Sequence, residues 1–170
     1  QSRSGEEKPP RIDSERRKLY NKLEIIASSR SAAGRRRWRK KDMQTKSAKK
    51  KVRSLRIIIV GCGKVGHTLT EQLVREGHDI TIVDTNERVV RDTTDAFDVM
   101  GIQGNGASLS VLKEAGLEEA DLVIAVTGSD ELNLLCCTIA KKAGGELAAI
   151  ARVRNPDYSE ELPYLRQQLG

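Results

Sequence analysis

A glycine-rich run is the part of the sequence whose residue types and spacing could do chemistry. Gly61-Cys-Gly-Lys-Val-Gly66 has the spacing GxGxxG and lies between a predicted strand and a predicted helix. In such a loop the first glycine permits a tight turn, the second lets the backbone approach a diphosphate, and the third lets the helix pack close to the sheet. The unpaired N–H groups at the helix start then attract phosphate.

A carboxylate follows this loop at a spacing that suits a nucleotide ribose. Asp84 ends the next predicted strand, 18 residues after Gly66. A carboxylate there can accept hydrogen bonds from both hydroxyls of an adenosine ribose, and it repels a 2′-phosphate. The loop and the carboxylate together therefore favour NAD(H) over NADP(H). The alternative interpretation is a domain of the same fold whose site is vacant.

Glycines and polar residues also follow the other predicted strands, where ligands bind in open α/β sheets. Gly104-Asn105-Gly106 suits a loop beneath an adenine, or an ordinary turn. Thr127-Gly128 could line the crevice, while Ser129 could cap the next helix. Arg152 and Arg154 follow the last strand. An arginine there could bind a phosphate with two hydrogen bonds, or pair with a nearby carboxylate.

The elements that must position these residues alternate between strand and helix. We expect strands at 56–60, 79–84, 99–103, 121–127 and 147–153, and helices at 67–76, 86–97, 108–115, 129–143 and 159–169. The first strand is a continuous β-branched run, typical of a strand that is buried on both faces. This alternation with short turns predicts a doubly wound parallel sheet, a Rossmann-like three-layer α/β/α fold.

The charges divide the 170 residues into two parts. Residues 1–54 carry 19 Lys/Arg and 6 Asp/Glu, whereas residues 55–170 carry 11 and 18. The first part combines high net charge with little apolar surface, which favours a disordered tail with one marginal helix at 14–30. The basic composition therefore belongs to the tail and does not mark the domain as a nucleic-acid binder. No apolar run approaches the roughly 20 residues of a membrane span.

Residues that could catalyse a reaction do not accompany the glycine loop. His67 and His78 lie near the ends of a predicted helix, and Cys136-Cys137 lie in an apolar helical run that suits core packing. The three cysteines have neither a disulfide framework nor a metal spacing, which fits a reducing cytosol. A nucleotide site without a catalytic set points to a sensor or regulatory module.

Five motifs together give the sequence a family resemblance. They are RIIIVGCGKVG at 56–66, DITIVDTN at 79–86, QGNGAS at 103–108, AVTGSDELN at 125–133 and IARVRNPDY at 150–158. Residues 55–170 resemble the N-terminal nucleotide-binding domain of TrkA-type potassium-uptake proteins, also called the RCK or KTN domain. The resemblance implies the Rossmann-like fold that the alternation predicts.

The resemblance also implies a function and a set of ligand positions. Such proteins are regulatory, non-enzymatic, cytoplasmic subunits, peripheral to the inner face of the membrane, that bind NAD(H), or ATP/ADP in relatives, and control a potassium transporter or channel. Pairing through the exposed flank of the sheet implies a homodimer or a larger homo-oligomer. Carried over by motif, the cofactor-binding residues are Gly61, Cys62, Gly63, Lys64, Val65, Gly66, Asp84, Gly104, Asn105, Thr127, Gly128 and Arg152.

Two features depart from the family pattern. Family chains usually continue into a sixth strand and a small C-terminal domain, so we expect this chain to be a fragment. Residues 1–54 match nothing in the family, whose members typically begin with Met directly before the first strand. We hypothesise that Leu55 marks the true start, read from a non-AUG codon, and that the preceding residues are not native.

Two rival functions stay open. One is a small NAD-dependent oxidoreductase domain, although the missing catalytic set argues against it. The other is a redox-sensing protein that binds nucleic acid through its basic tail, where Lys/Arg runs surround Trp38. A regulatory nucleotide-binding subunit of a potassium-uptake system is the interpretation that explains most of the motifs.

Overall fold

The computed structural model describes residues 54–158 and Tyr164. The described residues belong to one unit of the chain, Arg53–Gly170. The predicted helix at 14–30 and nearly all of the one at 159–169 lie outside the described residues. The division of the chain at residue 54 stays a prediction.

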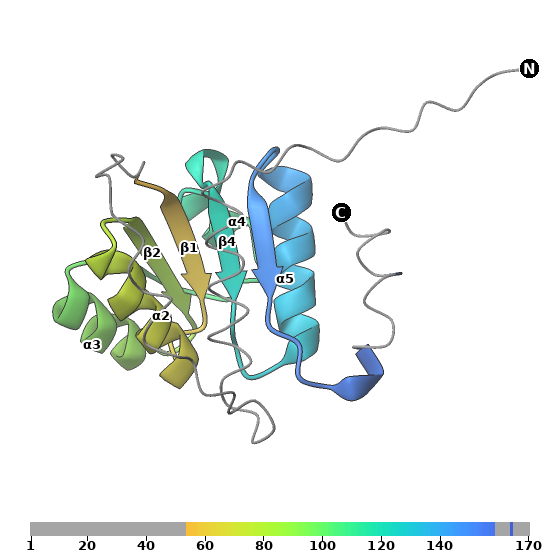
Figure 1. The fold of residues 1–170 in the computed structure, drawn as a ribbon, viewed down its shortest axis with the longest axis horizontal. Helices are drawn as coiled ribbons and strands as arrows, with labels where there is room; N and C mark the ends of the chain where they lie inside the picture. Colours follow the sequence, from red (N-terminus) through yellow and green to blue (C-terminus); the bar gives the residue numbers. More distant parts are fainter. Residues whose placement is uncertain (1–53, 159–163, 165–170) are drawn as a thin grey trace, which may run out of the picture. The chain divides into compact units, whose positions relative to one another are not determined.

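The centre of the described unit is a parallel sheet of five strands (Figure 1). The strands are β1 (Arg56–Val60), β2 (Asp79–Asp84), β3 (Met100–Gln103), β4 (Leu122–Ala125) and β5 (Ala148–Ala151). Their order is β3-β2-β1-β4-β5, and every neighbouring pair is parallel. This order confirms the predicted doubly wound, Rossmann-like fold. It places the chain reversal between β1 and β4, so the loops after β1, β2 and β4 gather at one edge.

The helices cover both faces of this sheet. On one face, α2 (Lys64–Arg75) contacts α3 (Glu87–Phe97), and on the other α4 (Leu109–Glu114) contacts α5 (Asp130–Ala143). A short 3-10 helix, η2 (Leu117–Glu119), follows α4. Successive residues of a strand point to opposite faces of the sheet, and here helices cover both faces. Residues 57–60 of β1 are therefore all at most 2% exposed.

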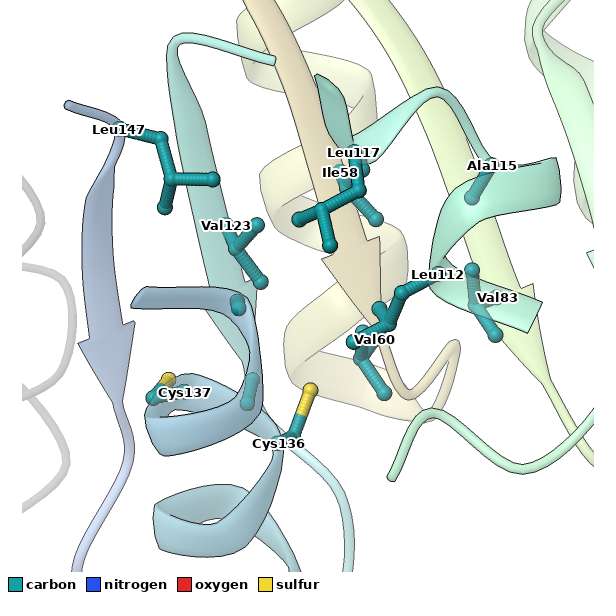
Figure 2. Close-up of a cluster of buried hydrophobic side chains, with 12 residues drawn as sticks. Ile58, Val60, Val83, Leu112, Ala115, Leu117, Val123, Cys136, Cys137 and Leu147 are labelled. Carbon is teal, nitrogen blue, oxygen red and sulfur yellow. The ribbon is translucent and has the colours of Figure 1, made fainter. Parts of the chain in front are cut away.

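The core between the sheet and the α4–α5 layer holds two of the three cysteines (Figure 2). Cys136 and Cys137 belong to the same buried cluster as Val60, Val123 and Leu147, and Figure 2 shows the side chain of Cys136 pointing toward Val60. Burial raises the pKa of each thiol to about 12, and for Cys137 the neighbouring Cys136 adds to the shift. The predicted role of this pair in core packing is confirmed.

Several predicted boundaries were wrong by a few residues. Helix α2 begins at Lys64, three residues before the predicted start at His67. The two glycines at 63 and 66 hide the apolar periodicity of the first turn, although the N–H of His67 already bonds to the carbonyl of Gly63 at 2.9 Å. Strands β4 and β5 are shorter than predicted because Thr127 and Arg152–Val153 lie in loops at the strand ends.

Within the described residues, none of the helices combines the length and the apolar character that crossing a membrane would require.

Candidate functional site

The turn after β1 has a conformation that only glycine adopts easily. Gly61 has φ +96°, in the left-handed region, and its N–H donates to the carbonyl of Val83 at 2.8 Å. A Cβ at this position would lie 2.8 Å from the main-chain nitrogen of Thr127. The turn therefore brings the ends of β1, β2 and β4 close together.

The start of α2 differs from the starts of α3 and α5. Asn86 caps α3 by accepting from the N–H groups of Arg88 and Val89, and Ser129 caps α5 by accepting from Leu132. Both helices also have acidic residues in the first turn. Among the described residues no side chain caps α2, and its first turn has no acidic residue. Its N–H groups and the positive end of its dipole are thus left for an anion.

Gly63 and Gly66 are glycines for different reasons. A Cβ on Gly66 would lie 1.9 Å from the carbonyl oxygen of Gly61, so this glycine lets α2 pack on the turn, as predicted. Gly63 has an ordinary φ of −63°, and a Cβ there would meet no described atom within 4 Å. Neither backbone strain nor contact inside the domain explains Gly63. Close approach of a ligand to the backbone would explain it.

The carboxylate of Asp84 ties the tip of β2 to the glycine loop. Its Oδ2 accepts from the N–H of Cys62 at 2.7 Å, and its Oδ1 accepts from the N–H of Asn86 at 2.9 Å. Each carboxylate oxygen has two lone pairs, so one acceptor site on each stays available after these bonds. Asp84 is half-buried, with its carboxylate held in a fixed orientation beside the uncapped start of α2.

Cys62 takes part in this loop through its main-chain N–H, which donates to Asp84, and its thiol is buried. The side chain is 4% exposed, and its Sγ lies 4.0 Å from the carbonyl of Val83. Burial, reinforced by the nearby charge of Asp84, raises the pKa of the thiol to about 12. A protonated, buried thiol is a poor nucleophile, so the redox role is disfavoured relative to a small residue in a tight turn.

The glycines after β3 have a packing role. A Cβ on Gly104 would lie 2.7 Å from the side chain of Val111, and one on Gly106 would lie 2.2 Å from Val60. Asn105 lies exposed between them, with Oδ1 accepting from Ala107 at 3.0 Å. Residues 104–106 therefore form a turn whose glycines are required by packing. A role near an adenine stays a prediction for Gly104 and Asn105.

The loop after β4 is organised by a buried amide. Asn133, on α5, is 0% exposed, and its Oδ1 accepts from the N–H of Thr127 at 2.8 Å and from the Thr127 hydroxyl at 2.7 Å. The hydroxyl of Thr127 has only one proton to donate, and this proton is used in the hydrogen bond to Asn133. Gly128 is exposed and would accept a Cβ without contact to any described atom within 4 Å.

The two arginines after β5 have different surroundings. Arg154 donates from Nε to Asp130 Oδ1 at 3.1 Å and from Nη2 to the carbonyl of Gly128, which matches the predicted alternative of an arginine paired with a carboxylate. Arg152 is half-buried, and no hydrogen bond or ion pair joins its side chain to a residue that the structure describes. Of the two arginines, Arg152 is therefore the one whose guanidinium is not held by the described residues.

Asp130 is an ionised carboxylate that is 7% exposed. Burial alone would raise its pKa, but hydrogen bonds from the N–H groups of Arg154 and Asn155 and the Arg154 guanidinium outweigh burial and lower the pKa below its ordinary value. Sequence reasoning missed Asp130 and Asn133. Their signal is weak, because polar residues in a first helical turn usually serve only as caps.

The fold and this arrangement define a class: a Rossmann-like domain with a glycine loop and an acidic strand tip. The family profile of the TrkA-N domain matches residues 57–167, so the chain belongs to the TrkA-N domain family. The predicted resemblance to the N-terminal RCK domain of TrkA-type proteins is confirmed.

Curated relatives carry the same family name. The chain is 42% identical over 107 residues to the Trk system potassium uptake protein TrkA of Vibrio alginolyticus, an alignment that covers 63% of this chain and 23% of that protein. It is 42% identical over 116 residues to the TrkA homolog of Archaeoglobus fulgidus, covering 68% and 26%. The chain thus spans about a quarter of the length of these relatives.

Solved structures at 22% identity share the fold. The TrkA-N domain of the inner membrane protein ybaL from Escherichia coli aligns with a TM-score of 0.59, covering 69% of this chain and 84% of that one. The AMP-bound Kef C-terminal domain of Shewanella denitrificans aligns at 0.57, covering 67% of each chain. The GsuK channel bound to NAD also aligns at 0.57, covering 68% and 21%.

Proposed function

We propose that this chain is a regulatory subunit of a potassium-uptake system, and that it binds an adenine nucleotide, NAD(H) in the first place and ATP or ADP as alternatives. In this proposal the ligand-dependent conformation of the subunit controls an integral-membrane transporter or channel. The subunit associates with the cytoplasmic side of the membrane as a homodimer or larger homo-oligomer. The named function of the TrkA relatives and the NAD- and AMP-bound relatives of the fold support this proposal.

One observation carries the nucleotide proposal. The Asp84 carboxylate is fixed 2.7 Å from the N–H of Cys62, beside a helix start that has no side-chain cap. One part of the loop can then hold the diphosphate by its N–H groups, while the carboxylate accepts hydrogen bonds from the ribose hydroxyls. Because a 2′-phosphate would face this carboxylate, NADPH should bind more weakly than NADH.

The described side chains support a regulatory role over catalysis. The Nδ1 atom of His78 accepts from the N–H of Leu55 at 3.3 Å, and the ring of His67 contacts the ring of Phe97 at a centroid distance of 4.7 Å. All three thiols are buried and carry a raised pKa. Regulation would work by population shift, in which nucleotide binds one arrangement of the assembled subunits more tightly.

Calorimetric titration of NADH tests the ribose assignment. Asp84→Ala removes two ribose hydrogen bonds, each worth about 0.5–1.5 kcal/mol, so we expect the affinity to fall about tenfold or more. Asp84→Asn should also narrow the preference for NADH over NADPH, since the repelling charge is gone. Asp79→Asn is the matched control, because Asp79 is exposed at the opposite end of the same strand. Unchanged NADH affinity in Asp84→Ala would refute the assignment.

The regulatory part of the proposal needs a transport measurement. Potassium-uptake rates should differ between cells that express a responsive transporter with this chain and cells that express it with the Asp84→Ala variant. Steady-state oxidation of NADH by the purified chain with candidate substrates tests the rival oxidoreductase. Turnover there, together with unchanged uptake, would favour the rival.

A further inference from the structure

The Asn133 side chain continues the sheet beyond its last main-chain hydrogen bond. That last bond runs between β5 and β4, from the N–H of Arg152 to the carbonyl of Ala125, at 2.9 Å. Beyond it, Asn133 accepts from the N–H of Thr127 at 2.8 Å and donates from Nδ2 to the carbonyl of Arg152 at 2.8 Å. One amide therefore sets the separation of the two strand ends.

Asn133 lies at a buried position where an amide without hydrogen bonds would be destabilising. Asn133 is 0% exposed, and burial of an unpaired amide is unfavourable. Its oxygen takes two hydrogen bonds from Thr127, and its nitrogen gives one to Arg152. An apolar residue of similar volume would fill the same space without any of these bonds. The polar side chain is thus explained by what it positions and not by packing.

Arg152 and Arg154, which follow β5 in the sequence, differ in which of their atoms are hydrogen-bonded. The guanidinium of Arg154 is held by Asp130 and by the carbonyl of Gly128. The main chain of Arg152 is held on both sides, by Ala125 through its N–H and by Asn133 through its carbonyl, while its side chain has no partner among the described residues. Arg152 is thus a cation without a side-chain partner among the described residues, on a strand end that is fixed next to the Thr127 loop.

We propose that Asn133 is a positioning residue of the nucleotide site, which acts by fixing the main chain of Arg152 so that its guanidinium can bind a ligand phosphate. The inference rests on the proposed nucleotide-binding function. A loss of the Asn133–Arg152 bond would free the start of the segment that leaves β5. The guanidinium would then lose part of its preorganisation toward the anion.

A double-mutant cycle on the full chain tests this inference, with NADH affinity as the readout. Asn133→Asp keeps an acceptor for Thr127 but turns a carboxylate oxygen toward the carbonyl of Arg152, so that the hydrogen bond is lost and the two oxygens repel each other; we expect at least about three- to tenfold weaker binding. Arg152→Ala should lose a similar factor or more. In the Arg152→Ala background, Asn133→Asp should change the affinity by less than about twofold, because both changes remove one interaction.

Thr93→Val is the matched control. Thr93 is a buried polar residue of α3 that donates to the carbonyl of Val89 at 2.7 Å, away from the β4 and β5 ends. This variant should lose stability but keep its NADH affinity. A purely structural role for Asn133 would instead give multiplicative losses in the cycle, and that result would overturn the inference, as would unchanged affinity in folded Asn133→Asp.

The inference can also be tested if the variants do not fold. If Asn133→Asp does not fold, Asn133→Ala at low temperature takes its place in the cycle. If neither folds, NADH must slow amide hydrogen exchange at both Thr127 and Arg152 in the wild-type chain, and no change there overturns the inference. Absence of wild-type binding to NADH, NAD⁺, ATP and ADP would overturn the proposed function itself.

Discussion

At the scale of single residues, the domain places two of its few buried polar side chains where main chain must be held at strand ends. Among the described residues, four polar or charged side chains are buried, and two of them, Asp130 and Asn133, lie in the first turn of α5. They bond to residues that lie 19 to 25 positions later in the chain. These side chains therefore connect the loop after β4 to the segment after β5.

The residues of the glycine loop were predictable because their reasons are local. A tight turn at Gly61 and close packing at Gly66 follow from the spacing alone, and Asp84 follows from its place at a strand end. The role of Asn133 depends on β5 being the neighbour of β4, which no local pattern contains. The different surroundings of Arg152 and Arg154 depend on Asp130 in the same way, because Asp130 binds only Arg154 of the two.

The buried thiols make a prediction about alkaline pH. Each thiol has a pKa raised from 9.0 to about 12 in the folded state, so unfolding above pH 9 releases protons. This contribution to stability is complete below pH 9 and is lost as pH rises toward 12, by about 1.4 kcal/mol per pH unit for each thiol. Urea denaturation between pH 8.5 and 10.5 measures the slope. Cys136→Ala should lower the slope by one thiol's share, and an unaltered slope would contradict the buried, protonated state.

At the scale of elements, the start of α2 shows why boundaries were harder to predict than the elements themselves. All five strands and the helices within the described residues lie where alternation places them. The N-cap of α2 is Gly63 and its first turn contains Gly66, so the apolar pattern of a helix is missing there; a packing contact with the Gly61 carbonyl requires the glycine at 66. At Gly66 the demand for close packing therefore overrides helix propensity.

A pair of alanine substitutions separates this packing demand from the proposed approach of a ligand. Gly66→Ala places a Cβ 1.9 Å from the Gly61 carbonyl and should cost about 1–3 kcal/mol of unfolding free energy. Gly63→Ala meets no described atom and should cost less than about 1 kcal/mol, as an alanine at a helix N-cap. It should nevertheless weaken NADH binding, because its methyl group occupies the approach to the backbone. Denaturation and calorimetry on both variants measure this, and Gly63→Ala with full affinity would contradict the diphosphate position.

The first turn of α5 makes a prediction at acidic pH. The pKa of Asp130 is lowered in the folded state, mainly by bonds from Arg154 and Asn155 that outweigh burial. Its contribution to stability is present above the ordinary pKa of 3.8 and is lost as pH falls through the lowered value. Asp130→Asn should cost about 1–3 kcal/mol at pH 7 and show a smaller loss of stability below pH 4. Asp157→Asn, an exposed neighbour, is the control that should change neither quantity.

At the scale of the whole molecule, the order of the strands assembles the site. Asp84 ends β2, the glycine loop follows β1, Thr127 follows β4 and Arg152 follows β5, and these strands are successive neighbours. Parallel strands bring all these ends to one edge, so residues from 61 to 152 meet there. The alternation of elements made this edge predictable, whereas the cross-strand bonds that fix each loop were not.

The described unit should fold without residues 1–53. Leu55 is 6% exposed, its N–H donates to His78 and its carbonyl accepts from Asp79 at 2.9 Å, so it is already part of the packed core of the described unit. We expect deletion of 1–53 to change the unfolding free energy by less than about 0.5 kcal/mol. Leu55→Ala in the full chain is the contrasting variant and should cost about 2–5 kcal/mol. Denaturation of both compares them, and a deletion that unfolds the domain would refute the boundary.

The most direct test of the account is a crystal structure of the full chain grown with NADH. We predict electron density for the diphosphate against the N–H groups of residues 63–65 and for the ribose hydroxyls within hydrogen-bond distance of the Asp84 carboxylate. Density for NADH elsewhere on the domain, with Asp84 bonded only to Cys62 and Asn86, would contradict it.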